Sequence, residues 1–316
     1  REAPKHPEVC VLQAESEVAS VNMLYGAGGA GGRVMTTTSS PGYSLMQEGI
    51  SYIACAEIPS VFVNVQRGGP GLGTIQPSQG DYFQAVKGGG HGDYRLIVLA
   101  PNSVQEMVDH TVLAFDLADK WRNPVLILTD GAIGQMMEKV ELPESYKFKS
   151  SEDMRVEKPW ATNGKKGREK NVLTSLNIKS EDMERKNHEL QAKYAKITDE
   201  EVRYESFHLD DADIVICAYG LSSRICKKVV DVGRERGMKV GLLRPITLWP
   251  FPSKKIDELA AKESVKLFMS IEMNAGQMVE DVKLAVNGRK PVHHYGRMGG
   301  IIFTAEDILN QIKEKI

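Results

Sequence analysis

The feature that most constrains the fold of this chain is a regular alternation of short apolar runs with longer helical patterns. Apolar runs occur between residues 9 and 145 at 9–13, 33–39, 61–65, 96–100 and 124–130, and helical patterns lie between them at 16–27, 43–55 and 103–120. Such alternation predicts a mainly parallel sheet covered by helices. The run PVLILTD is apolar at nearly every position, as expected of a strand buried on both faces.

The C-terminal part repeats this alternation on a smaller scale. Apolar runs at 213–220, 238–244 and 265–271 alternate with helical patterns at 221–236, 253–262 and 276–287. The residues between the two parts are rich in charge and are interpreted as a linker or arm, with one polar helix at about 178–197. We therefore predict an α/β chain in three parts, residues 1–145, 146–206 and 207–316.

Composition narrows the classes of function. The chain has 316 residues, with 40 Lys and Arg against 42 Asp and Glu, so no strong field draws nucleic acid or an anionic membrane. The four cysteines lack a CxxC pair and a nearby histidine, which predicts reduced, mostly buried thiols and no zinc or iron-sulfur site. No apolar run approaches the roughly 20 residues that span a bilayer, and no signal peptide is evident. We expect a cytoplasmic protein.

The segment between the apolar runs 61–65 and 96–100 is long and rich in glycine, QRGGPGLGTIQPSQGDYFQAVKGGGHGDYR. Long connections without periodicity are usually functional, and glycines allow a backbone to approach a ligand closely. Arg67, Lys87, His91 and Asp93 are the side chains in it that we consider for an anionic substrate. Arg67 directly follows the strand and precedes two glycines, a position suited to binding a carboxylate.

Gly26, Gly28 and Gly31 spell G-x-G-x-x-G, which on its own suggests a nicotinamide-dependent dehydrogenase. A dinucleotide fingerprint must follow a strand and open a helix. Here the glycines end a predicted helix and a strand follows, so we interpret them as a tightly packed helix C-terminus.

Glu17 begins the first predicted helix, just after an apolar run. It either complements the helix dipole, as Glu15 also would, or faces a ligand at the carboxyl end of the sheet. The turn at Ser39, Ser40, Pro41 and Gly42 is interpreted as a helix N-cap whose hydroxyls and amides can also line a cofactor pocket. Arg244 is interpreted as a structural or interface residue, and the C-terminal part as scaffold and contact surface.

Several segments together resemble a known family: QAESEVAS, TTTSSPGYSLMQEGISYIA, the glycine-rich loop, LRPITLWPFP and EMNAGQ. They are similar to the alpha subunit of 2-oxoacid:ferredoxin oxidoreductases, and within that family to its 2-ketoisovalerate (VorB-type) branch. The resemblance implies the pyrimidine-binding domain of a thiamine diphosphate enzyme, a parallel sheet with helices on both faces, followed by a transketolase-C-terminal-like α/β domain.

The resemblance also assigns roles to residues. It implies that Glu17 hydrogen-bonds the aminopyrimidine ring of thiamine diphosphate and relays a proton, and that Arg67 pairs with the substrate carboxylate. Further cofactor contacts are implied at Ser39, Ser40 and Gly42. Further substrate contacts are implied at Thr74, Gln76, Lys87 and His91.

The implied reaction is oxidative decarboxylation of a 2-oxo acid to acyl-coenzyme A and CO₂, with ferredoxin as electron acceptor. The beta subunit would hold most of the cofactor diphosphate and its Mg²⁺. Iron-sulfur clusters would lie on partner subunits and none on this chain. The implied partners are a beta subunit, a gamma subunit and a ferredoxin-like delta subunit.

Two departures from the family pattern qualify these expectations. The chain opens at Arg1 without the family's N-terminal Tyr-Pro-Ile-Thr-Pro segment, so we expect a longer natural chain with one further strand, helix and substrate contact. The stretch PGLGTIQP after Arg67 differs from the pattern of the 2-oxoglutarate branch and favours a branched-chain substrate. Gln76 leaves 2-oxoglutarate open, and a non-catalytic docking subunit is the remaining alternative.

Overall fold

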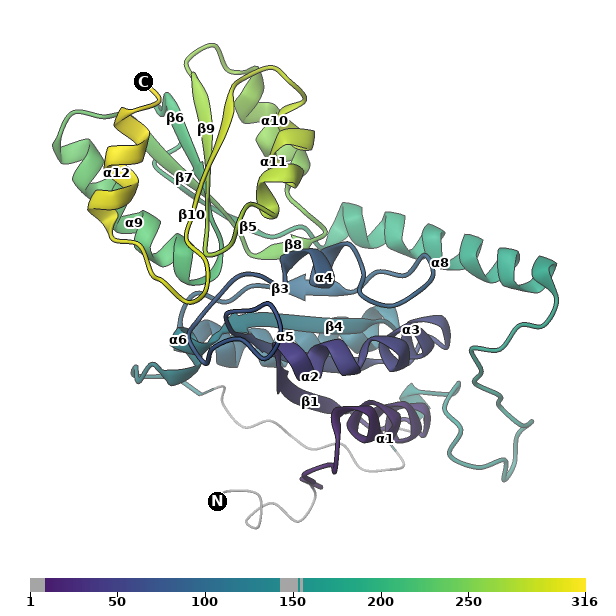
Figure 1. The fold of residues 1–316 in the computed structure, drawn as a ribbon. Helices are drawn as coiled ribbons and strands as arrows, with labels where there is room; N and C mark the ends of the chain where they lie inside the picture. The colour runs from purple at the N-terminus through teal and green to yellow at the C-terminus, as the bar shows by residue number, and fades with distance from the viewer. Residues whose placement is uncertain (1–8, 143–152, 154–155) are drawn as a thin grey trace.

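Two five-stranded sheets organise the chain in the computed structural model, which describes residues 9–142, 153 and 156–316 (Figure 1). The expected N-terminal segment and part of the charged linker lie outside the described residues. The N-terminal sheet consists of β1 (Met35–Ser39), β2 (Ser60–Gln66), β4 (Pro124–Asp130), β3 (Ile97–Leu99) and β8 (Thr247–Trp249), in that spatial order. The first four run parallel, and β8 is antiparallel to β3.

The C-terminal sheet has the same design. Its spatial order is β10 (Val292–Gly296), β9 (Leu267–Glu272), β6 (Ile214–Cys217), β7 (Val240–Pro245) and β5 (Tyr204–Phe207). Four strands are parallel, and β5 is antiparallel to β7. Each sheet therefore ends in one antiparallel edge strand.

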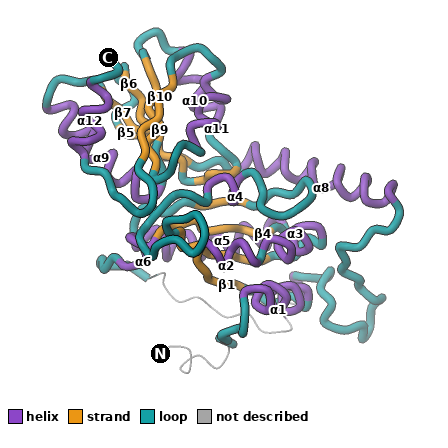
Figure 2. Tube along the Cα trace, viewed as in Figure 1, coloured by secondary structure: helices purple, strands orange, loops and turns teal. Residues whose placement is uncertain are grey.

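Helices cover both faces of the N-terminal sheet, as the tube in Figure 2 shows. One face packs on α1 (Glu17–Gly29), α2 (Ser40–Leu45) and α3 (Gln47–Cys55), and the other on α5 (Val104–Trp121) and α8 (Ser180–Glu200). Strand β4 is buried at all seven positions because alternate side chains enter the cores on opposite faces. Two short helices complete this part: α6 (Gly131–Gln135) directly follows β4, and α4 (Tyr82–Val86) lies in the connection between β2 and β3.

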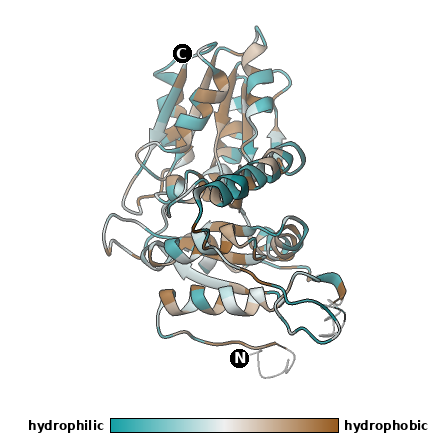
Figure 3. Cartoon of the chain, turned by 90° about the vertical axis from the view of Figure 1, so that its right-hand side faces the viewer, coloured by the Kyte–Doolittle hydropathy of each residue, from teal (hydrophilic) through white to brown (hydrophobic). Residues whose placement is uncertain are grey.

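The C-terminal sheet lies between two further helix pairs. Helices α9 (Gly220–Glu235) and α12 (Ala305–Lys313) pack on one face, and α10 (Ser253–Ala261) and α11 (Met278–Val286) on the other. The apolar core on the α10 and α11 side is continuous with the core beneath α1 to α3. Figure 3 shows this distribution, with hydrophobic strands inside and hydrophilic helix surfaces outside.

Several predicted elements differ from the structure. The strand predicted at 9–13 is wrong: these residues form no ladder, and Val11 and Leu12 are 67% and 71% exposed. The single helix predicted at 43–55 is two helices that meet at Met46. The glycine-rich loop contains the short helix α4. Of the four cysteines only Cys217 and Cys226 are buried, whereas Cys10 is exposed.

The predicted polar helix of the arm is confirmed as α8, and its amphipathic pattern explains its position. Only Leu190, Tyr194 and Ile197 are buried, all in its C-terminal half, where they pack on the α5 face of the sheet. The N-terminal half is polar and extends beyond the body of the molecule (Figure 1).

Candidate active site

The candidate site lies at the carboxyl ends of β1 and β2, where open α/β sheets place ligands. Glu17 is the first residue of α1, and the Ser16 hydroxyl caps the helix by accepting a hydrogen bond from the Ala19 N–H at 3.2 Å. The cap fixes the start of the helix, so the half-buried Glu17 side chain has a defined origin.

Gly42 makes room for the Glu17 carboxylate. A Cβ atom at position 42 would lie 2.5 Å from Glu17 Oε1 and 2.2 Å from Thr38 Oγ1. No side chain fits there, so glycine lets the backbone of α2 and the carboxylate lie in contact. Ser39 occupies the N-cap position of α2 as predicted, but its side chain makes no capping hydrogen bond.

Ser40 connects this region to Arg67. The Arg67 backbone N–H donates to Ser40 Oγ at 3.1 Å, and the Ser40 hydroxyl donates to Asp81 Oδ2 at 2.5 Å. The half-buried Arg67 side chain has a buried Nε with no hydrogen-bond partner among the described residues. A buried donor of this kind is costly unless a ligand satisfies it. The Glu17 carboxylate therefore packs against the first turn of α2, and the Arg67 backbone is hydrogen-bonded to the same turn.

Thr74 and Gln76 lie in a tight turn against the residue after Arg67. The Thr74 N–H donates to the Gly68 carbonyl at 2.7 Å, and the Gly68 N–H donates to the Gln76 carbonyl at 3.0 Å. Between them, Leu72 and Ile75 are 82% and 74% exposed. The turn therefore holds its polar predicted residues next to Arg67 and presents apolar side chains outward.

The remaining predicted loop residues make contacts elsewhere. Lys87 forms an ion pair with Asp281 of α11. The exposed His91 ring lies edge-on to Tyr52 of α3, with 6.2 Å between ring centroids. Asp93 is exposed, and its carbonyl accepts from Gln191 of α8. These contacts join the loop to its neighbours, so a substrate role for Lys87 and His91 stays a prediction.

Sequence reasoning missed a polar cluster beneath the site. Asp81 accepts hydrogen bonds from Ser40 Oγ and, at 2.8 Å, from Asn64 Nδ2, and its N–H donates to Gln66 Oε1 at 3.1 Å. Asn64 and Gln66 are fully buried, and Asn64 Oδ1 has no partner among the described residues. The available signal was Asn64 and Gln66 in the C-terminal half of the strand SVFVNVQ, where apolar residues are expected.

Asp130 ends β4 beside Gln66 of β2 and is 1% exposed. Burial raises the pKa of its carboxyl to about 6, although hydrogen bonds from the Ile133 and Ala132 N–H groups oppose this shift. Asp130 Oδ1 caps α6 through these hydrogen bonds, at 3.1 Å and 2.9 Å. Asp130 thus has a near-neutral pKa and lies one strand from Arg67, but its role is structural, as the cap of α6.

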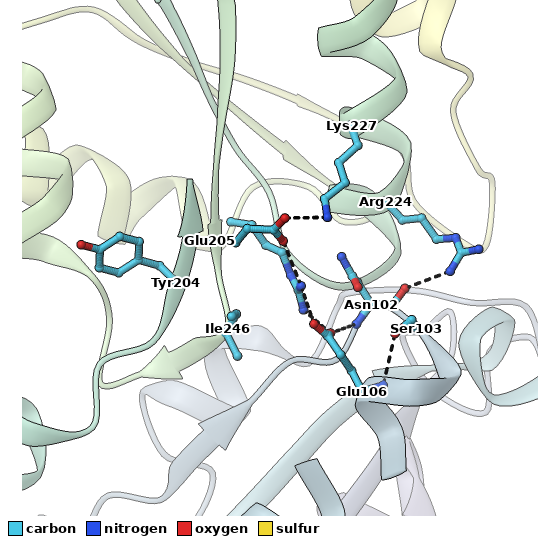
Figure 4. Close-up of a pocket in the computed structure, with 9 residues that line it drawn as sticks. Asn102, Ser103, Glu106, Tyr204, Glu205, Arg224, Lys227 and Ile246 are labelled. Atoms are coloured by element: carbon cyan, nitrogen blue, oxygen red, sulfur yellow. Dashed lines mark hydrogen bonds and ion pairs between the residues drawn. The ribbon is translucent and has the colours of Figure 1, made fainter. Parts of the chain in front are cut away.

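A cleft of about 680 Å³ lies beyond the carboxyl end of β3, two strands away from β2 (Figure 4). Arg244, Glu106 and Glu205 form its ionic floor. The fully buried Arg244 donates to Glu106 Oε1 at 2.8 Å and to Glu205 Oε2 at 3.3 Å. The carboxylates of Glu106 and Glu205 neutralise Arg244, so the cleft lies at an ionic contact between the two sheets. The prediction of a structural or interface role for Arg244 is confirmed.

The described residues contain neither a metal-binding cluster nor a membrane-spanning helix. No cluster of three or more His, Cys, Asp or Glu side chains there is arranged to hold a metal ion. No helix in that part of the chain is both long and apolar enough to cross a membrane.

Comparison with family models identifies both parts of the chain. Residues 2–204 match the thiamine-diphosphate-binding family of pyruvate flavodoxin/ferredoxin oxidoreductases. Residues 212–308 match core domain II of pyruvate:ferredoxin oxidoreductase. Among curated proteins, the ketoisovalerate oxidoreductase subunit VorB of Methanothermobacter marburgensis is 54% identical over 303 residues, which is 96% of this chain and 84% of VorB.

Solved structures agree with this result. A 2-oxoglutarate:ferredoxin oxidoreductase from Magnetococcus marinus, with 2-oxoglutarate, coenzyme A and succinyl-CoA bound, superposes with a TM-score of 0.83 at 26% identity, over 99% of this chain and 58% of that chain. The chain thus spans little more than half of that protein. A split-gene transketolase shares the fold at 12% identity, with a TM-score of 0.61 over 99% of this chain and 85% of that chain.

The predicted α/β fold, with a thiamine-type domain followed by a transketolase-like one, is confirmed, and the glycine pattern at 26–31 closes a helix, as interpreted. The chain belongs to the 2-oxoacid:ferredoxin oxidoreductase family, in which its N-terminal part is a thiamine-diphosphate-binding domain.

Proposed function

We propose that this chain is the alpha-type subunit of an oxidoreductase that decarboxylates a branched-chain 2-oxo acid, such as 2-ketoisovalerate, and passes the electrons to ferredoxin. The observation that carries the proposal is that Glu17 packs against the first turn of α2, to which the Arg67 backbone is hydrogen-bonded. The name of the VorB relative supports the substrate class. The exposed apolar side chains of Leu72 and Ile75 beside Arg67 are consistent with it.

The residues present fit thiamine diphosphate. Glu17 has a carboxylate oxygen held against the backbone of Gly42, and the buried Asn64 Oδ1 and Arg67 Nε lack protein partners in the described part of the chain. Glu17 and the half-buried Arg67 thus place an acid and a cation at one end of the sheet. Bound thiamine diphosphate would supply the electron sink for decarboxylation.

Each side chain has a proposed task. Glu17 would hold and relay a proton at its carboxylate oxygen. Arg67 would pair with the substrate carboxylate through its planar guanidinium and orient the bond to be cleaved. Gly42 and Ser39 would border the cofactor through their backbone. The Ser40 hydroxyl donates its proton to Asp81, so Ser40 would act by holding the Arg67 backbone N–H.

We further propose that the pocket is shared between subunits. A beta subunit would hold the diphosphate and its Mg²⁺, while gamma and ferredoxin-like delta subunits would carry iron-sulfur clusters and coenzyme A would accept the acyl group. Supporting this division, the four cysteines of this chain are dispersed: Cys10 precedes α1, Cys55 ends α3, and the buried Cys217 and Cys226 lie on β6 and α9.

The test is reconstitution of the complex with and without this chain's key side chains. We expect no turnover from this chain alone, turnover after assembly, and a loss of roughly 10²-fold or more for Glu17→Gln, the usual scale for a general acid-base group. Arg67→Met should raise the KM for the 2-oxo acid by a similar factor. Unchanged activity in assembled Glu17→Gln would instead support a docking subunit.

2-Oxoglutarate is the second candidate substrate because the Magnetococcus protein holds it. The two candidates separate in one assay: kcat/KM for 2-ketoisovalerate and 2-oxoglutarate measured on the same assembled enzyme. A higher value for 2-oxoglutarate would overturn the branched-chain assignment and leave the reaction class intact.

A further inference from the structure

The segment Ser78–Asp81 of the glycine-rich loop inserts between the two sheets. Gln79 is 1% exposed, and every one of its polar groups is satisfied by the C-terminal part of the chain. Its N–H donates to the Met273 carbonyl at 3.0 Å, and its Nε2 donates to the Tyr219 carbonyl at 2.8 Å. Its Oε1 accepts from Ser222 Oγ at 2.7 Å and from the Met273 N–H at 2.9 Å. Its carbonyl accepts from Asn274 Nδ2 at 2.7 Å.

Two residues later, Asp81 is held by the N-terminal sheet. Its Oδ2 accepts from Ser40 Oγ at 2.5 Å and from Asn64 Nδ2 at 2.8 Å. Ser40 Oγ in turn accepts from the Arg67 N–H at 3.1 Å. A continuous series of hydrogen bonds therefore runs from Asp81 to the backbone of the proposed carboxylate-binding arginine.

The segment is too short for Gln79 and Asp81 to move independently of each other. The Cα atoms of Gln79 and Asp81 are separated by at most about 7 Å of extended chain, so neither residue can move far without the other. Gln277, at the start of α11, holds the next turn: its Nε2 donates to the Gly80 carbonyl at 2.7 Å, and its Oε1 accepts from the Phe83 N–H at 2.8 Å. The segment is thus fixed to both sheets.

A purely stabilising role would also place a satisfied amide at Gln79, because buried polar groups in folded proteins are nearly always paired. Two observations favour positioning instead. Asp81 bonds the hydroxyl that holds Arg67, and Arg67 keeps a buried Nε without a partner in the described part of the chain. If Arg67 binds the substrate carboxylate, the position of its guanidinium depends on the groups that fix its backbone.

We propose that Gln79 and Asp81 are positioning residues for Arg67, through which the C-terminal sheet sets the geometry of the substrate carboxylate site. The proposal rests on the proposed function, in which Arg67 binds that carboxylate. It makes the C-terminal part of the chain a contributor to substrate orientation, beyond the scaffold that the sequence indicates.

The experiment measures steady-state kinetics of the assembled enzyme carrying Asp81→Leu, Gln79→Met or both. For each single variant we expect kcat/KM for the 2-oxo acid to fall about tenfold or more, mainly through KM. Because the two residues act as one unit, the double variant should be no worse than the worse single variant within about twofold. Arg224→Gln is the matched control, since it removes another contact between the sheets, to Glu138 and Asn102, far along the chain from Arg67. It should leave the KM unchanged.

Asp81→Leu keeps nearly the shape of aspartate and removes both acceptor oxygens, so it carries the test if Gln79→Met fails to assemble. An unchanged KM in Asp81→Leu, or multiplicative losses in the double variant, would overturn the proposal. Arg67→Met in the same assay distinguishes failure of the proposed function from failure of the positioning role. If Arg67→Met leaves the KM unchanged, the proposed function fails. If Arg67→Met raises the KM and Asp81→Leu does not, only the positioning role fails.

Discussion

Single residues at the candidate site are constrained by close contacts as well as by charge. Gly42 and Gly26 illustrate the difference, since both are glycines in helices of the same layer. A Cβ atom at Gly42 would meet Thr38 and Glu17, whereas a Cβ atom at Gly26 would have no neighbour within 4 Å. The Gly42 position is therefore reserved for the Glu17 carboxylate, and the Gly26 position tolerates a side chain.

This contrast predicts different outcomes for the same substitution. Gly42→Ala should displace the Glu17 carboxylate and reduce turnover of the assembled enzyme by roughly 10²-fold, the scale of a 1 Å misplacement. Gly26→Ala lies inside α1 and should leave turnover unchanged while adding up to about 1 kcal/mol of helix stability. Equal activities in the two variants would show that the close contact at Gly42 has no functional consequence.

The free energy of unfolding should depend on pH through the carboxyl of Asp130. Because burial raises the pKa of its carboxyl from 3.8 to about 6, the native state keeps a proton that the unfolded chain releases. This contribution to stability is present below pH 4 and is lost as the pH rises to about 6, a change of up to about 3 kcal/mol. Urea unfolding at pH 4.5 and 7.0 should show a smaller difference in Asp130→Asn than in the natural protein. The same difference in both proteins would rule out Asp130 as the source.

At the scale of elements, the buried apolar residues of α8 lie from its middle to its C-terminal end. Its apolar residues Leu190, Tyr194 and Ile197 pack with α5, and Tyr194 lies edge-on to Trp249 of β8 at 5.8 Å between ring centroids. The polar N-terminal half has no comparable apolar packing within the described residues. The C-terminal half of α8 should therefore account for most of its contribution to stability.

Two leucines test this asymmetry with the same change. Leu190 is 3% exposed, and Leu176, in the segment before α8, is 69% exposed. Leu190→Ala should lower the free energy of unfolding by about 2–5 kcal/mol, as for other buried leucines. Leu176→Ala should stay within about 0.5 kcal/mol. Equilibrium urea unfolding measures both, and a small effect for Leu190→Ala would contradict the packing of α8 described above.

The elements also show which parts of the fold the sequence predicts. Strands β2 and β4 were predictable because each contains a run of large apolar residues, as burial on both faces requires. The run at 9–13 is similarly apolar, yet it pairs with no strand among the described residues. Strands β5, β8 and β10 were missed because they are short edge strands, and β10 has the mixed sequence VHHYG.

The site residues also divide into those with a local signal in the sequence and those without one. Glu17 and Arg67 were found because each adjoins the end of an apolar run, a signal local to the sequence. Asp81 and Gln79 were missed because their partners are distant, 41 residues away for Ser40 and 143 for Ser222. Hydrogen bonds between remote segments depend on the packing of the two sheets, which no local pattern encodes.

For the whole molecule, Arg244 is the main ionic contact between the sheets. It lies on β7, is 1% exposed, and pairs with Glu106 of α5 and Glu205 of β5. Removing one partner of a buried ion pair is costly because it leaves the other charge uncompensated. The nearby pair of Lys227 and Glu205 is much more exposed.

Arg244→Met should therefore lower the free energy of unfolding by about 3–5 kcal/mol. Lys227→Met, which breaks the exposed pair with Glu205, should change it by less than about 1 kcal/mol. Unfolding of both variants in urea, followed by circular dichroism, gives the comparison. Similar small losses in both would mean that the cleft between the sheets is solvated enough to screen Arg244.

Strand β8 returns from the C-terminal part of the chain to complete the sheet that begins at Met35. A single proteolytic cut between Thr162 and Ile178 would consequently leave an N-terminal fragment whose sheet lacks its fifth strand, because the C-terminal fragment carries β8. Genes encoding the two fragments as separate polypeptides would therefore yield a complete N-terminal sheet only by complementation.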